Sequence, residues 1–362
     1  MRIFVIGARG FPDVEGGIEK HCEGLYPGLV DKGCIITALT IKGYGERDSW
    51  KGINFIKIPA PHLKNLEKPS YNFFAAVYSF FKRPDIIHVH GLNAGFFIWF
   101  FKLFRIKIVA TYHSMDYIYP KWNKYVKIML RFSEMQFLSA DYIITVSKGY
   151  LQHFYNKGRT RFISYLPNGI HLEGLANYVD DQLLEKWGLR KGEFVLYVGR
   201  ITPEKDLATL IEAFNKINLP SLKLVIAGSA SFKKDEYLES LKKISSKDIF
   251  FLGQLNKKEL SVLYSNCALF VIPSIYEGLP NALLEAMSFK CRILASNIDA
   301  HKEIGLDEKD YFNVQDSKDL ADKIKQKTTD NIKRNYLEII VKNYNWDNIA
   351  QSTYKIYKSL SI

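Results

Sequence analysis

At 362 residues the chain is longer than one hydrophobic core usually supports, so we expect two domains of ordinary size. Hydrophobic residues make up 47% and charged residues 24% of it, a balance that is typical of folded globular proteins and excludes a disordered chain. The net charge is +12, and it is one-sided: residues 1–170 hold 23 Lys and Arg against 12 Asp and Glu, whereas residues 171–362 hold 27 against 26.

The start of the chain is a short apolar run, residues 2–6, that leads into a glycine-rich turn. It lacks the longer apolar segment and the cleavage site of a signal peptide. The longest apolar stretch, residues 94–101, is too short to span a bilayer. The four cysteines show no C-x-x-C spacing, which is typical of buried thiols in a reducing compartment. We therefore expect a cytoplasmic protein.

Strand and helix patterns alternate through the first half of the chain. The amphipathic stretch 18–32, closed by Gly33, is typical of a helix that follows the first strand. Such alternation predicts a parallel α/β sheet with right-handed crossovers. The expected strands are residues 2–6, 35–40, 55–58, 85–90, 107–112, 141–146 and 162–166.

A turn at Pro167-Asn168-Gly169, followed by weak periodicity, predicts a domain boundary at about residue 170. Beyond it the strand pattern restarts, and from about residue 331 the chain is predicted to be helical. The predicted fold class is α/β, with two Rossmann-like doubly wound parallel-sheet domains, residues 1–170 and 171–362, facing each other across a cleft. The expected strands of the second domain are residues 194–198, 223–226, 249–252, 269–272 and 292–295.

Polar residues and glycines gather where the first-half strands end, which is the edge at which doubly wound sheets bind ligands. Gly16 and Gly17 stand at a helix start, where free backbone amides and the helix dipole suit a phosphate; the alternative is a tight turn that needs glycine. His88 and His90 share one face of a strand, and His113 follows the next strand. The three could hold a metal, but no carboxylate or cysteine spacing supports it, so we expect none. His113 is the best candidate for substrate contact.

The second half shows the same clustering at its strand ends. Arg200 and Lys205 flank the turn into a helix, where two cations could neutralise the charge on a diphosphate leaving group. Glu277 and Glu285 could accept hydrogen bonds from vicinal hydroxyls of a sugar and a ribose. The alternative is a set of ordinary surface charges. The strand, turn and helix that surround the two glutamates favour the site.

Two segments of the first half combine basic and aromatic residues, namely residues 96–107 and 121–132. Amphipathic basic helices lie in membrane interfaces, whereas the alternative is a crossover helix with a solvated back. Because the excess positive charge sits in the same half, we expect peripheral contact with an anionic membrane, at the inner face of the cell membrane.

Taken together, the motifs resemble the retaining glycosyltransferases of family 4, which have the GT-B fold. They occur in the family's order over about the whole chain. The opening segment resembles bacterial members that build capsule, exopolysaccharide or O-antigen. The matching motifs are Gly16-Gly17-Ile18-Glu19, His88-Val89-His90, Thr111-Tyr112-His113, Pro167-Asn168-Gly169, Gly199-Arg200 with Lys205, and Glu277-Gly278-Leu279-Pro280 with Leu284-Glu285-Ala286-Met287.

The resemblance implies that Arg200 and Lys205 hold the donor diphosphate, that Glu285 holds the ribose, and that Glu277 and His113 contact the donor sugar. Further donor-binding positions implied in this way are Gly16, Gly17, Gly199, Gly278 and Leu279. On the acceptor side it implies Asp13 and His90.

The resemblance also implies the partners. The donor is a UDP-, GDP- or dTDP-linked sugar, and the acceptor is a glycan or a polyprenyl-diphosphate-linked glycan of surface polysaccharide synthesis; no nucleic acid is expected. The chain has no D-x-D motif, which agrees with a site that needs no metal and no other cofactor. Asp206 and the stretches Gly228-Ser229-Ala230 and Lys290-Cys291-Arg292 depart from the family pattern and leave the donor base and sugar open. The alternatives are a sugar-nucleotide epimerase of the same fold and a non-enzymatic basic membrane-surface protein.

Overall fold

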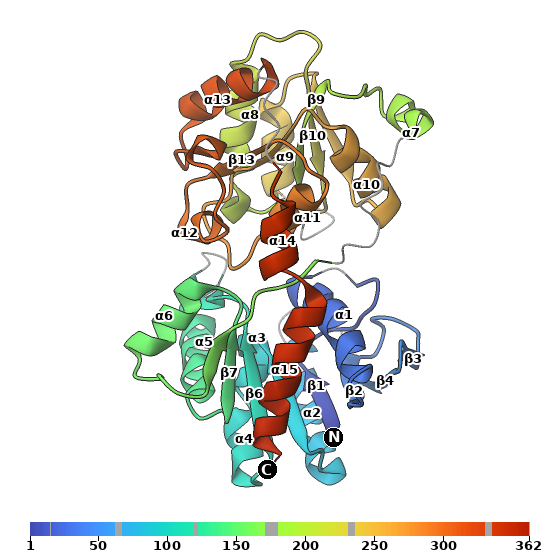
Figure 1. Ribbon diagram of the computed structural model, residues 1–362, viewed down its shortest axis with the longest axis vertical. Helices are drawn as coiled ribbons and strands as arrows, with labels where there is room; N and C mark the ends of the chain where they lie inside the picture. Colours follow the sequence, from blue (N-terminus) through green and yellow to red (C-terminus); the bar gives the residue numbers. More distant parts are fainter. Residues whose placement is uncertain are drawn as a thin grey trace. The chain divides into compact units, whose positions relative to one another are not determined.

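The computed structural model describes residues 1–14, 16–61, 67–118, 122–170, 180–230, 236–329 and 335–361. The chain divides into two compact units (Figure 1). Unit 1 comprises Met1–His171 together with Asn343–Ile362, and unit 2 comprises Leu172–Lys342. Each unit has a parallel sheet with helices packed on it, so the predicted α/β class with two Rossmann-like domains is confirmed.

The centre of unit 1 is an eight-stranded sheet in the order β3-β4-β2-β1-β5-β6-β7-β8. The neighbouring strands pair in parallel, apart from the antiparallel pair of β3 and β4. The winding reverses between β1 and β5, and such switch points are where doubly wound sheets bind ligands. The strands are β1 (Arg2–Ile6), β2 (Ile35–Ile41), β3 (Ser49–Trp50), β4 (Ile53–Ile58), β5 (Ile86–His90), β6 (Lys107–Tyr112), β7 (Tyr142–Thr145) and β8 (Ile163–Tyr165).

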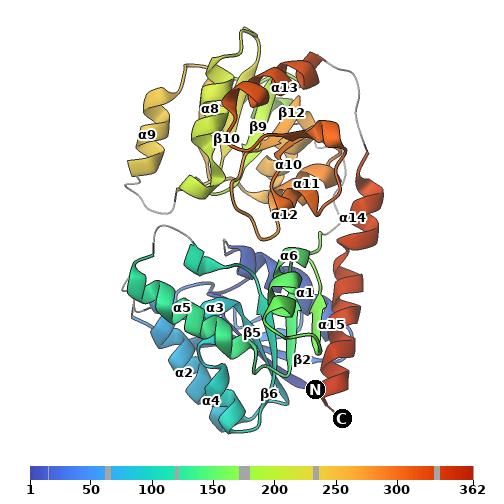
Figure 2. The ribbon, with the colours of Figure 1, turned by 90° about the vertical axis from the view of Figure 1, so that its left-hand side faces the viewer.

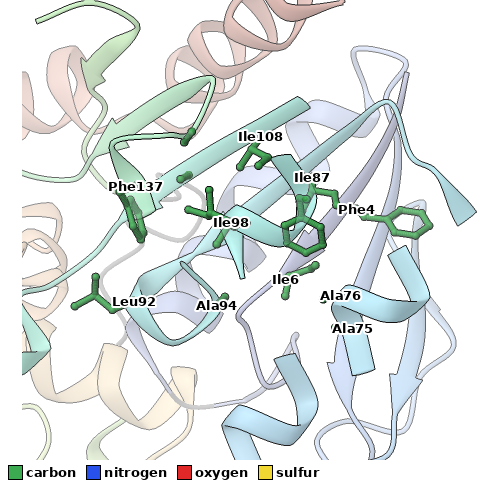
Figure 3. Packing of buried hydrophobic residues seen from close by; sticks show 14 of the residues in the cluster. Phe4, Ile6, Ala75, Ala76, Ile87, Leu92, Ala94, Ile98, Ile108 and Phe137 are labelled. Carbon is green, nitrogen blue, oxygen red and sulfur yellow. The ribbon is translucent and has the colours of Figure 1, made fainter. Parts of the chain in front are cut away.

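Both faces of this sheet are buried, because alternate residues of a strand point to opposite sides. Phe4 and Ile6 of β1 belong to one apolar cluster, shown in Figure 3, and Ile3 and Val5 belong to the other. The first cluster is completed by helices on its side of the sheet, and the second by α1 and α15. The helices of unit 1 are α1 (Gly17–Val30), α2 (Glu67–Lys82), α3 (Gly91–Gly95), α4 (Ile98–Leu103), α5 (Lys124–Phe137), α6 (Lys148–Asn156) and α15 (Trp346–Leu360), with the 3-10 turn η1 (Asp116–Ile118).

Unit 2 has a six-stranded parallel sheet in the order β11-β10-β9-β12-β13-β14. Its winding reverses between β9 and β12. The strands are β9 (Phe194–Val198), β10 (Lys223–Ala227), β11 (Ile249–Gly253), β12 (Leu269–Ile272), β13 (Ile293–Ser296) and β14 (Tyr311–Phe312). The helices are α7 (Asp181–Lys186), η2 (Pro203–Lys205), α8 (Leu207–Asn215), α9 (Glu236–Ile244), α10 (Lys257–Asn266), α11 (Asn281–Ser288), α12 (Asp299–Lys302), η3 (Glu308–Asp310), α13 (Ser317–Thr329) and α14 (Leu337–Asn343).

The end of the chain differs from the prediction, which assigned it to the second domain. Residues 343–362 belong to unit 1, where α15 packs along α1. Trp346 fills a space that glycines leave open: a Cβ at Gly24 or Gly169 would approach its ring to 2.1 and 2.7 Å. The helical pattern of the tail was correctly predicted, but helical spacing does not say which partner receives an apolar face.

Among the described residues, no helix combines the length and the apolar composition needed to cross a bilayer. Three of the four cysteines are buried and Cys267 is half-buried, and all four are free thiols.

Candidate functional site

In unit 2 the turns after β9 and β12 adjoin the switch point of the sheet. The turn after β9 passes close to the turn after β10: a Cβ at Gly228, whose φ is +146°, would lie 1.8 Å from the carbonyl oxygen of Gly199. Only glycine allows this approach of two backbones. The Tyr197 hydroxyl donates a hydrogen bond to the carbonyl of Arg200 at 2.9 Å. The Gly199-Arg200 turn is therefore fixed from two sides.

The predicted residues Lys205 and Glu277 meet at this point. Their Nζ and Oε1 atoms lie 2.5 Å apart although the residues are 72 positions apart in the chain. The Ser274 hydroxyl donates to the same Oε1 at 2.9 Å, and the backbone amide of Ile275 donates to the carbonyl of Glu204 at 3.0 Å. The side chains of Lys205 and Glu277 are only 15% and 10% exposed. The turn after β9 and the loop after β12 thus form one hydrogen-bonded unit.

The ion pair with Lys205 determines the charge state of Glu277. Burial alone would raise the pKa of Glu277, but the attraction of Lys205 and the hydrogen bonds from Lys205 and Ser274 lower it below its usual value. Glu277 is therefore a carboxylate, suited to accept hydrogen bonds from hydroxyls. His301, on α12, is buried nearby, and its burial lowers its pKa to about 4, so this ring is neutral.

The other predicted residues of unit 2 lie in the same two loops and in α11, in different environments. Arg200 is 57% exposed and lies 3.9 Å from Glu204, so its guanidinium can reach a ligand. Glu285, in α11, accepts a hydrogen bond from the Tyr264 hydroxyl at 3.0 Å, which orients its carboxylate. Gly278 is half-buried and Leu279 is buried, in the loop that leads into α11.

In unit 1 the glycine-rich turn after β1 packs against the end of β5. Gly7 has φ +115°, and a Cβ there would lie 2.1 Å from the carbonyl oxygen of His90. Gly16 has φ +144° and precedes α1, and Gly17 is its first residue, with open space where a Cβ would lie. The buried Glu19 accepts hydrogen bonds from the backbone and side chain of Arg9 at 3.1 and 3.0 Å. Arg9 and Glu19 thus brace the glycine turn.

His90 and His113 are brought together, with Nδ1 of His90 and Nε2 of His113 3.0 Å apart. His90 is buried, and its Nε2 lies 2.6 Å from the Tyr26 hydroxyl, which also contacts Nδ1 of His88 at 3.0 Å. His113 is half-buried at the end of β6. Burial, followed by the nearby His21 and His88, lowers the pKa of His113 well below its usual value. The ring is therefore neutral, and His90 lies behind it.

The histidines that converge are not the three considered from the sequence. Both ring nitrogens of His88 are engaged, Nδ1 by Tyr26 and Tyr357 and Nε2 by Thr111. His88 still lies next to His90, with ring centroids 4.3 Å apart, but the third ring that approaches both His90 and His113 is His21 of α1, whose centroid lies 4.8 Å from that of His113. A polar residue on the buried face of an amphipathic helix was the signal for it.

Asp13 lies apart from these groups. It has φ +67°, its side chain is 73% exposed, and its carboxylate lies 3.3 Å from Arg47. Sequence reasoning also missed Ser274 and His301, which hold or adjoin Glu277 and carry no recognisable spacing.

Comparisons with known proteins agree over both units. Residues 180–350 match the family model of the group 1 glycosyl transferases, and residues 15–173 match that of glycosyltransferase family 4. An uncharacterised glycosyltransferase of Methanocaldococcus jannaschii is 27% identical over 99% of this chain and 98% of its own. A UDP-Gal:alpha-D-GlcNAc-diphosphoundecaprenol alpha-1,3-galactosyltransferase of Escherichia coli is 33% identical over 42% of this chain and 41% of its own.

Solved structures share the architecture. Sucrose-phosphate synthase from Thermosynechococcus elongatus has a TM-score of 0.82 at 22% identity, covering 99% of this chain and 98% of that one. The Anabaena protein HepE in complex with UDP-glucose has a TM-score of 0.80 at 19% identity, covering 100% and 99%. These likenesses show the GT-B fold.

Proposed function

The chain belongs to the family 4 glycosyltransferases, and on that premise we propose that it moves a sugar from a nucleotide-sugar donor to a lipid-linked glycan acceptor, with retention of anomeric configuration and without a metal ion. The nearly buried Lys205–Glu277 pair, with Arg200 on the same turn as Lys205 and Glu285 on the helix that follows Glu277, is the observation that carries this proposal. A named relative acts with UDP-Gal on a diphosphoundecaprenol-linked sugar, and HepE binds UDP-glucose, which supports a UDP-sugar and a polyprenyl-diphosphate-linked acceptor of surface polysaccharide synthesis.

The diphosphate would be held by two cationic side chains, of which one is fixed by an ion pair and the other is more exposed. Lys205 has three N–H donors, and the bond to Glu277 fixes the direction of the ammonium group. Arg200 is more exposed and presents a planar fork that matches two phosphate oxygens. As the glycosidic bond breaks, negative charge grows on the departing diphosphate, and fixed cations stabilise that charge more than they stabilise the bound donor. These two residues would supply what a divalent cation supplies elsewhere.

The carboxylates would hold the hydroxyl groups of the donor. Glu285, oriented by Tyr264, would accept hydrogen bonds from the ribose, and Glu277, kept ionised by Lys205, would accept them from the donor sugar. His113 would contact the sugar as a neutral ring, and Gly16 and Gly17 would offer backbone amides to the phosphates.

Transfer by single-site variants tests these roles. We expect Lys205→Ala and Arg200→Ala each to lower kcat/KM by about 10²–10³-fold, the usual loss when one group that stabilises transition-state charge is removed. The matched control is Lys216→Ala, which removes a surface lysine that pairs with Glu212 and should leave transfer unchanged. Formation of the glycosylated lipid would be measured with radiolabelled UDP-sugars. Wild-type rates in both site variants would refute the assignment.

Turnover in the absence of acceptor separates transfer from the epimerase alternative. A transferase should hydrolyse the donor only slowly until a lipid-linked glycan is added, whereas an epimerase would convert the nucleotide sugar by itself. A panel of UDP-, GDP- and dTDP-sugars in a thermal-shift assay identifies the donor, because a ligand at a hundred times its Kd stabilises the folded state by about 2.7 kcal/mol.

We also propose that unit 1 docks on the inner face of the cell membrane, where anionic lipids would attract it. Helix α4 contacts both α2 and α5 (Figure 2), and all three carry large apolar side chains that face solvent. Ring contacts join them, with centroids 4.2 Å apart for Phe80 and Phe104 and 5.5 Å apart for Phe96 and Phe132. The exposed members, which we call the aromatic surface, are Phe73, Phe74, Phe81, Trp99, Leu103, Phe104, Tyr125, Ile128, Phe132 and Met135.

Charge on the same helices favours lipid over a neutral partner. The basic residues within α2, α4 and α5 are Lys68, Lys82, Lys102, Lys124, Lys127 and Arg131, of which Lys102 pairs with Asp141, whereas the acidic residues within these helices are Glu67 and the buried Glu134. An apolar surface edged by lysine and arginine matches the boundary between acyl chains and anionic headgroups.

A further inference from the structure

Three histidines from three elements of unit 1 converge on one point. His21 comes from α1, His90 ends β5, and His113 follows β6. One ring nitrogen from each lies within 4.8 Å of the other two. Zinc binds histidine nitrogen at about 2.0–2.1 Å, so two ligands of a tetrahedral ion lie about 3.3 Å apart. The 3.0 Å between His90 Nδ1 and His113 Nε2 is close to that separation; without an ion the two nitrogens share a hydrogen bond, so one of them carries a proton that a bound metal would displace.

The two ring nitrogens of His21 differ in their hydrogen bonding. Its Nδ1 lies 2.7 Å from the side-chain oxygen of Asn168, which fixes the proton on Nδ1 and leaves a lone pair on Nε2. That Nε2 is buried, and among the described residues it has no hydrogen-bond partner. Such a group costs free energy unless something satisfies it, so its presence requires an explanation.

The outer contacts of His21 and His90 are those that metal-binding histidines make. Ligating imidazoles donate their second ring nitrogen to an oxygen, which fixes the tautomer and the orientation of the ring. Asn168 occupies this position for His21, and the Tyr26 hydroxyl, 2.6 Å from His90 Nε2, occupies it for His90. His21 Nε2 is thereby left for a ligand, and the inner nitrogens of His90 and His113 become available to it once the proton of their shared hydrogen bond is released.

We propose that His21, His90 and His113 form a binding site for a divalent transition-metal ion of the Zn²⁺ class, with three nitrogen ligands and one open position on the side of the half-buried His113. Because the proposed function gives His113 a contact with the donor sugar, an ion on this ring would withdraw it from that contact. The ion would be a reversible inhibitor of transfer and not a cofactor for it.

Metal titration of the full chain tests the site without any substrate. After removal of metal with a chelator, Co²⁺ should bind in a one-to-one ratio and give the visible absorption of a low-coordinate nitrogen site, and Zn²⁺ should displace it. We expect His21→Gln to abolish this signal and Asn168→Ala to weaken binding about 10–100-fold. His153→Gln is the matched control, because it removes a histidine on α6 outside the trio.

Folding controls accompany the metal titration. Circular dichroism and thermal unfolding show whether each variant folds, and Asn168→Ala keeps all three ligands should His21→Gln fail to fold. The proposal is overturned if the wild-type protein binds neither ion, or if the wild type and Asn168→Ala bind equally tightly, or if His153→Gln loses binding as His21→Gln does.

Transfer assays then separate this proposal from the proposed function. Zn²⁺ should inhibit the wild-type enzyme, a chelator should restore it, and His153→Gln should respond like the wild type. Unchanged transfer at saturating Zn²⁺ would overturn the inhibitory role while leaving the binding result in place. If no donor supports transfer at all, the proposed function fails, and the titration with Co²⁺ still decides whether the site exists.

Discussion

The Lys205–Glu277 pair illustrates what single residues reveal before a structure is known. Both were predicted as donor-binding residues, one for the diphosphate and one for the sugar, because each stands at a strand end. Their contact could not be predicted, since 72 residues separate them and only the order β9–β12 in the sheet brings the two loops together. The pair also explains why Glu277 remains ionised while almost buried.

The buried ring of His301 makes the stability of the fold depend on pH. Its folded pKa of about 4 lies below its usual value of 6.5, so the unfolded chain takes up the proton first as the pH falls. The stability that the neutral buried ring contributes is complete above pH 6.5 and is lost between pH 6.5 and about 4. The slope approaches about 1.4 kcal/mol per pH unit for one such group. We expect His301→Gln to flatten this part of the stability curve.

Urea unfolding of unit 2 at pH 7 and at pH 5 measures this difference. The variant should lose less stability than the wild type over that interval, by about 1–2 kcal/mol. The control is Lys216→Ala, which should follow the wild-type pH dependence because it leaves the buried ring in place. An identical slope for His301→Gln and the wild type would contradict a lowered folded pKa.

At the scale of elements, buried strands were predicted best. Residues 107–112, 194–198 and 269–272 match β6, β9 and β12 to the residue, because a parallel strand buried on both faces is a continuous apolar run bounded by polar or turn residues. The strands β3 and β14 were missed, since two residues carry no periodicity. Helix α15 was predicted as a helix, but its partner was not.

The contact of α15 with unit 1 can be tested at Trp346. This side chain is buried in the cluster that includes α1, and it occupies the space left by Gly24 and Gly169. We expect Trp346→Ala to lower the stability of unit 1 by about 3–5 kcal/mol, the usual cost of emptying a buried aromatic site. Circular dichroism in a denaturant titration and hydrogen exchange of α1 amides would measure the loss.

The control for this variant lies on the exposed side of the same helix. Lys355→Ala should change stability by no more than about 0.5 kcal/mol, because the side chain faces solvent. If Trp346→Ala shifted the unfolding of unit 2 and left unit 1 unchanged, the tail would belong to the second domain, as the linear sequence had suggested.

For the whole molecule, the distribution of charge is the property that the sequence conveys most directly. The excess of basic residues in 1–170 was countable before any fold was known. Their position beside the aromatic surface was not, because that surface is assembled from α2, α4 and α5, which are distant in the chain. Helical spacing alone identified the basic segment of α5, and the sheet order determines which helices share its face.

Binding to vesicles tests the role of this surface. Vesicles rich in phosphatidylglycerol should retain the protein at low salt and release it at high salt, whereas phosphatidylcholine vesicles should retain little, because the Debye length falls from about 30 Å at 0.01 M to 3 Å at 1 M. Replacing Tyr125, 82% exposed, and Ile128 by serine should weaken binding, since both lie on the exposed face of α5. Lys124→Glu with Arg131→Glu should weaken it by at least about 2 kcal/mol, or some thirtyfold, at about 1 kcal/mol per basic residue.

Tyr276→Ser and Ile244→Ser are the matched controls, because they remove exposed apolar side chains of unit 2. If the control variants lose as much vesicle binding as the variants of the aromatic surface, general hydrophobicity and not that surface governs binding. If the wild type does not bind anionic vesicles at low salt, the membrane proposal is refuted, whereas the proposed donor site of unit 2 is unaffected.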